Sequence, residues 1–143
     1  MTAKLLYRTA SGLLLLFAAM HTYGFMKFRP ATNEGVALRE AMDNVHFSVR
    51  GADFTYGGFY VGFGLSVTVY LLFSAFLAWH LGGLANRQPD AIGALGWVFV
   101  ALELVCVALA WRYFSAAPAA LSALVAACLA WAAWLVQAGA TPT

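Results

Sequence analysis

Long apolar runs separated by short polar segments dominate the chain. The first run ends with charge and a helix breaker at Lys27, Arg29 and Pro30. The second run is followed by a predicted polar turn that contains the glycine pair at 82–83 and Pro89. Each run is long enough to cross the bilayer hydrocarbon of about 30 Å at about 1.5 Å per residue. The pattern predicts an all-α integral membrane fold, a four-transmembrane-helix bundle forming one membrane domain over residues 1–143. The predicted spans are about 5–26, 55–81, 91–113 and 119–137.

The polar stretch after the first run has a helical period of its own. Its apolar residues recur at i, i+4, i+7 and i+11, which gives one apolar stripe; they are Leu38, Met42, Val45 and Val49. Thr32 or Asn33 suits an N-cap, and Gly51 is a natural helix stop. We predict an amphipathic helix over about residues 33–50, between the first two spans, which lies in the membrane interface or covers one end of the bundle.

The composition places the chain in the membrane class. Hydrophobic residues make up 63% and charged residues 10%, whereas soluble domains have about 45–50% and about 25%. The eight Lys and Arg residues are scattered and the formal net charge is +2, so no nucleic-acid footprint is present. The lipid bilayer is the expected partner. The flanking basic residues do not decide the orientation of the chain.

Glu103, near the middle of the third apolar run, is the leading candidate for a functional residue. A carboxyl group surrounded by hydrocarbon is costly, and intramembrane acids are therefore functional candidates by default. His21 lies six residues before Lys27 and Glu103 lies nine before Arg112, so their depths differ by only about 4–5 Å. If the first and third spans face each other, the two side chains could share a hydrogen bond or a water. We predict that Glu103 and His21 form an acid–base or ligand-binding pair.

Polar residues of the cap would extend this site on the same side of the bundle. We predict a ligand-binding role for His46, Asp43, Arg50 and Tyr56. Each candidate also has a structural interpretation. The intramembrane acid and histidine could satisfy each other inside the bundle, His46 could lie on a solvated face, and Arg50 could brace the loop.

Familiar catalytic and cofactor motifs are absent from the sequence. It has no GxSxG, HExxH, Walker A or dinucleotide glycine pattern. His21 and His80 are predicted near opposite faces of the membrane, which disfavours a bis-histidine haem, and the ligand spacing gives no support for a metal. No cofactor and no metal is expected.

Two segments carry a resemblance to a known family. HTYGF, at 21–25, and DFTYGGFYVGFGLS, at 53–66, with Met42 between them, resemble a family of short four-helix bacterial membrane proteins that has no assigned activity. In size and layout the chain is also similar to the DoxX-like proteins. The resemblance implies the four-helix layout, a special role for the region of His21 and a place in the bacterial inner membrane. It transfers no activity.

Three hypotheses for function remain open at this stage. In the first, Glu103 and His21 bind a small apolar or amphipathic molecule, and they could also carry out acid–base chemistry on it. In the second, the protein is a dimeric, proton-coupled transporter in which Glu103 alternately binds a proton and a substrate. In the third, it is a non-catalytic subunit or assembly factor that contacts a membrane-protein partner through its small-residue helix edges, of which Gly58, Gly62 and Ser66 form one.

Overall fold

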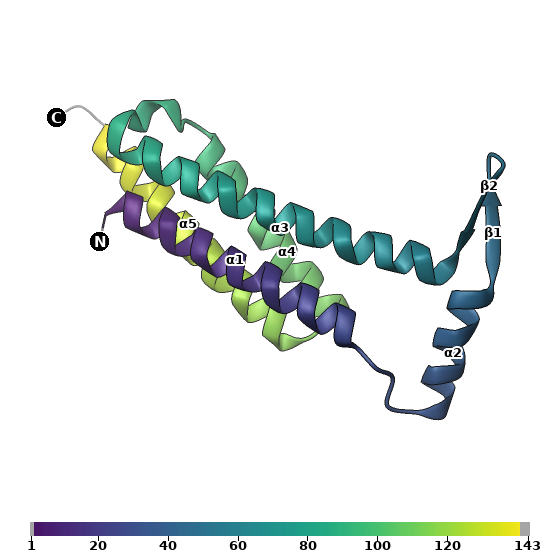
Figure 1. The fold of residues 1–143 in the computed structure, drawn as a ribbon. Helices are drawn as coiled ribbons and strands as arrows, with labels where there is room; N and C mark the ends of the chain where they lie inside the picture. Colours follow the sequence, from purple (N-terminus) through teal and green to yellow (C-terminus); the bar gives the residue numbers. More distant parts are fainter. Residues whose placement is uncertain (1, 141–143) are drawn as a thin grey trace. The chain divides into compact units, whose positions relative to one another are not determined.

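The computed structural model describes residues 2–140, and most of this part of the chain is helical (Figure 1). The described helices are α1 (Ala3–Lys27), α2 (Asn33–Asn44), α3 (Tyr56–Arg87), α4 (Leu95–Tyr113) and α5 (Ala116–Ala140), with a short 3-10 turn, η1, at Pro89–Ala91. Two short strands, β1 (His46–Val49) and β2 (Ala52–Thr55), lie between α2 and α3. The prediction of an all-α fold with four long apolar helices is therefore confirmed.

Within residues 2–140, four helices are long and apolar enough to cross a membrane: α1, α3, α4 and α5. These four helices indicate a membrane protein. The longest, α3, has 32 residues and is about 48 Å long, more than the hydrocarbon thickness of about 30 Å. It continues through Gly82 and Gly83, where the sequence pattern predicted a turn, so that prediction is wrong. A Cβ at Gly82 would lie 3.2 Å from the Lys4 carbonyl oxygen, so this glycine serves close helix packing.

By its internal contacts the chain divides into two compact units. The first unit consists of Met1–Phe17 with Leu71–Thr143, and the second of Ala18–Tyr70. Helices α1 and α3 therefore contribute to both units, and each unit is described separately below.

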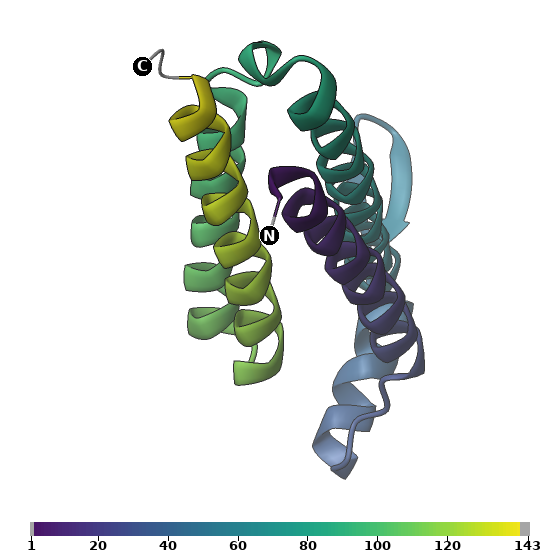
Figure 2. The same ribbon diagram turned by 90° about the vertical axis from the view of Figure 1, so that its left-hand side faces the viewer.

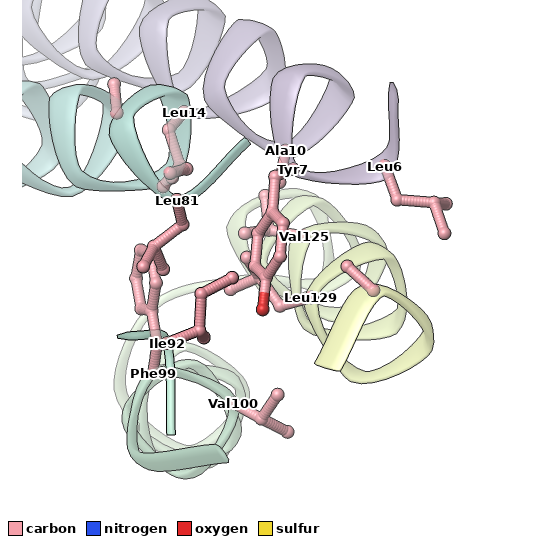
Figure 3. Close-up of a cluster of buried hydrophobic side chains, with 13 residues drawn as sticks. Leu6, Tyr7, Ala10, Leu14, Leu81, Ile92, Phe99, Val100, Val125 and Leu129 are labelled. Carbon is pink, nitrogen blue, oxygen red and sulfur yellow. The ribbon is translucent and has the colours of Figure 1, made fainter. Parts of the chain in front are cut away.

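The first unit is built around a cluster of buried apolar side chains from α1, α3, α4 and α5 (Figure 3). Helices α4 and α5 form an antiparallel hairpin and lie side by side along their length (Figure 2). The adjoining ends of α1 and α3 are also antiparallel, because Arg8 stacks on Trp79 and Ser11 donates a hydrogen bond to the Ala75 carbonyl. The cluster includes four alanines, which let helix backbones approach closely; they are Ala10, Ala75, Ala78 and Ala132.

The second unit contains α2 and a β-hairpin in place of one long amphipathic helix. Thr32 is the N-cap of α2, and its side chain accepts a hydrogen bond from the Gly35 N–H at 3.1 Å, as predicted. The helix ends at Asn44, however, and the prediction that it continues to residue 50 is wrong. Strands β1 and β2 pair antiparallel instead.

A two-residue turn at Arg50 and Gly51 produces this hairpin. Both residues have positive φ angles, 51° and 85°, as a type I′ turn requires. Phe47 and Phe54 pair across the strands with ring centroids 5.9 Å apart, and such aromatic pairs stabilise antiparallel sheets. Apolar and polar residues alternate over 45–49, which fits a strand, but Val45 and Val49 also have the spacing of one helix face.

We expect Gly51→Val to loosen the hairpin. A β-branched residue in the left-handed region costs about 1–2 kcal/mol, so the amides of residues 46–55 should exchange with solvent about 5–30 times faster. Hydrogen–deuterium exchange with mass spectrometry measures this directly. Ala52→Val, at a strand position, is the matched control and should leave exchange unchanged. Equal exchange in the Gly51 variant and the native protein would contradict the turn assignment.

Candidate functional site

Glu103 lies on the inward face of α4. The buried residues of this helix recur at helical spacing and form one stripe; they are Gly96, Phe99, Val100, Glu103 and Ala110. The opposite face carries exposed leucines and valines, as expected for a lipid-facing surface. Only 4% of the Glu103 surface is exposed. The acid therefore points into the protein.

The Glu103 carboxyl group has no hydrogen-bond or ion-pair partner among residues 2–140. The packing of α4 on α5 explains why. A Cβ at Gly96 would lie 3.3 Å from the Ala133 Cβ, and seven residues further along this antiparallel pair Glu103 is level with Ala126. Ala126 is buried and has no polar side-chain atom to offer. A buried acid without a partner is costly in an apolar interior.

Tyr7 supplies a second unpartnered polar group in the same unit. Its side chain is fully buried, and its hydroxyl has no hydrogen-bond partner in the described part of the chain. The side chain extends from α1 between α4 and α5 (Figure 3). The hydroxyl lies so close to Gly96 that a Cβ there would be 2.8 Å away.

Two serines and the Arg8 Nε atom are further buried polar groups of this unit, and Arg8 Nε also lacks a hydrogen-bond partner among residues 2–140. Ser11 lies one turn after Tyr7 on α1 and donates to the Ala75 carbonyl at 2.8 Å, and Ser122 of α5 is 2% exposed. Tyr7, Ser11 and Ser122 were not predicted as site residues. The available signal was the spacing of Tyr7 and Ser11, four residues apart in an apolar run, which places both on one helix face.

His21 belongs to the second unit, where it has a partner. Its Nε2 lies 3.0 Å from the Gly64 carbonyl oxygen, so the Nε2–H tautomer donates a hydrogen bond there. The ring stacks on Phe25 with centroids 5.9 Å apart, and the Phe25 ring fills the space that a side chain at Gly64 would need. Glu103 belongs to the other unit, so its pairing with His21 stays a prediction.

The four predicted cap residues have separate contacts in the second unit. Asp43 accepts from Arg39 Nε at 3.2 Å, and its carboxylate lies against Gly57. His46 Nδ1 is 2.6 Å from Asp53 Oδ2. Arg50 occupies the hairpin turn, and the ring of Tyr56 packs on Phe47 with centroids 4.8 Å apart. These contacts fit structural roles, and a ligand role for the four residues stays a prediction.

The described residues also contain no cluster of three or more His, Cys, Asp or Glu side chains that could hold a metal ion. The four long apolar helices suggest a membrane protein, and one of its units buries an acid on the inward face of α4. Comparisons with protein-family models, with curated proteins and with solved structures give no match.

Proposed function

We propose that this protein lies in the bacterial inner membrane and binds a small amphipathic molecule through Glu103. The observation that carries the proposal is the isolation of this acid, which is 4% exposed and has no hydrogen-bond or ion-pair partner among residues 2–140. A charged residue at the centre of a membrane helix costs about 2.5–3.5 kcal/mol on insertion scales. A ligand that offers an amine or another hydrogen-bond donor would offset this cost.

Tyr7 supports the same proposal from a neighbouring helix. Its buried hydroxyl also lacks a partner in the described chain, and unmade hydrogen bonds of buried groups cost about 1–3 kcal/mol each. The Tyr7 hydroxyl lies at Gly96, seven residues or about 10.5 Å along α4 from Glu103, so it is a second polar position along the same helix. The apolar side chains of the first unit would contact the hydrocarbon part of a bound molecule.

We assign Glu103 a binding role rather than a chemical step. The predicted acid–base partner, His21, already donates a hydrogen bond from its Nε2–H to the Gly64 carbonyl oxygen. A histidine held in this way is less available as a proton acceptor at its Nε2 atom. Binding requires only the Glu103 carboxyl group, so binding is the simpler role for a carboxyl group that has no partner among residues 2–140.

A hydrophobic carbodiimide tests whether a small apolar molecule reaches Glu103. Dicyclohexylcarbodiimide converts a protonated carboxyl group to a stable N-acylurea, which peptide mass spectrometry locates. We expect labelling of Glu103 in nanodiscs, and we expect dodecylamine to slow it about tenfold, because hydrogen bonds to charged groups contribute about 1.5–3 kcal/mol.

Two controls make this experiment decisive. Dodecanoate has the same chain but an acidic head, so it should not protect Glu103. The water-soluble carbodiimide should label the exposed acids Glu34 and Glu40 in preference to Glu103. If Glu103 stays unlabelled, or if dodecylamine has no effect on its labelling, the proposed binding role is wrong.

A further inference from the structure

A groove of ≈ 290 Å³ lies in the second unit, and neither Glu103 nor Tyr7 is among its lining residues. It is formed by the end of α1, the link into α2, the exposed α2 helix and the start of α3. Six of its nine lining residues are apolar and three are charged. The apolar ones are Phe25, Met26, Phe28, Pro30, Val36 and Val61, and the charged ones are Arg29, Arg39 and Glu40.

Specific contacts hold the walls of the groove in place. Pro30 packs against the first turn of α2 so closely that a Cβ at Gly35 would lie 2.8 Å from the Pro30 Cβ. Arg39 bonds through Nε to Asp43 and lies over the ring of Tyr60, 5.8 Å from its centroid. A guanidinium group has five N–H donors, so the four donors on the two terminal nitrogens of Arg39 remain for another acceptor.

The charge of the groove is positive. Arg29 is exposed and has no hydrogen-bond, ion-pair or ring partner among residues 2–140. Two arginines against one glutamate give the lining a net charge of +1. Planar guanidinium groups bind phosphate oxygens by paired hydrogen bonds, which makes arginine well suited to phosphate recognition.

We propose that this groove binds the phosphate of an anionic phospholipid. Arg29 and Arg39 would donate to the phosphate oxygens, and Phe25, Met26 and Val61 would contact the upper part of an acyl chain. A lipid fits better than a soluble anion because most of the lining is apolar and because the groove adjoins the end of α1, a helix long enough to span the bilayer. Basic residues beside a membrane helix also attract anionic lipids electrostatically. The site is independent of the role proposed for Glu103.

Native mass spectrometry of the full chain released from nanodiscs tests the proposal. The nanodiscs contain phosphatidylglycerol and phosphatidylcholine in equal amounts, and the measured quantity is retained phosphatidylglycerol. Arg29→Gln should lower retention about fivefold, and the double change with Arg39→Gln should lower it about 25-fold. Arg87→Gln, in the other unit, is the control and should leave retention unchanged.

Competition separates a lipid from a free phosphate. Dihexanoyl phosphatidylglycerol should displace the retained lipid, whereas inorganic phosphate at the same concentration should not. Arg29 has no partner to lose, so Arg29→Gln should keep the native thermal midpoint and its retention value can be interpreted directly. Equal retention in the native protein and the double variant would overturn the site. Equal displacement by inorganic phosphate would overturn the lipid as its ligand.

Discussion

Replacing Glu103 with leucine should make the protein more stable. The native acid is buried on the inward face of α4 without a partner among residues 2–140, and its removal relieves the cost of a polar group in an apolar interior. The gain should be about 1–3 kcal/mol, the cost of a buried polar group that has no hydrogen-bond partner. Reversible unfolding of the detergent-solubilised protein, followed by circular dichroism, measures the change in unfolding free energy.

Two further variants test whether the gain in stability comes from removing the buried acid. Glu103→Gln keeps the shape and a polar amide, so it should gain less than the leucine variant. Leu104→Glu places an acid on the exposed face of the same helix and should give no gain. The leucine variant should also lose dodecylamine binding. A Glu103→Leu protein less stable than the native one would show that the acid has a structural partner and would remove the basis for a binding site.

The long helices could be predicted from the sequence because their signal is strong and local. Runs of about 20 apolar residues have few alternatives to a spanning helix, and all four predicted runs are helical. The exact end of a helix depends more on residues that are distant in the sequence. The helical path of α3 through Gly82 and Gly83 depends on the backbone of Lys4, which lies far away in the sequence. A glycine pair that allows close packing looks the same in sequence as a glycine pair that forms a turn.

The β-hairpin was not predicted because the helical period and the strand period both fit the same short stretch. Val45 and Val49 are four residues apart, which fits a helix face, but with Phe47 they also fit one face of a strand. Ten residues are too few to separate the two patterns. The positive φ of Arg50 decides the outcome in the structure, and arginine is not a residue that signals such a turn.

Glu103 could be identified as a candidate because an acid in an apolar run is rare. Its burial follows from the stripe of inward residues on α4. Tyr7 could not be identified in the same way, because a tyrosine near the start of a span usually marks the membrane interface. Only the absence of a side chain at Gly96 makes room for its hydroxyl inside the protein, and that contact joins residues 89 positions apart.

The contact between Tyr7 and Gly96 leads to the last prediction, a pair of coupled substitutions. Gly96→Ala should destabilise the protein by about 1–3 kcal/mol, because the added Cβ would lie 2.8 Å from the Tyr7 hydroxyl and 3.3 Å from the Ala133 Cβ. Tyr7→Phe should be neutral or stabilising, because it removes a buried hydroxyl that has no partner in the described chain. The double variant should recover much of the loss, because the closer of the two clashes is gone.

A double-mutant cycle of unfolding free energies measures this coupling. Gly83→Ala is the matched control, because no atom lies within 4 Å of a Cβ built there. It should show only the gain in helix propensity, up to about 1 kcal/mol. A double variant as unstable as Gly96→Ala alone would mean that the Tyr7 hydroxyl does not limit the space at Gly96.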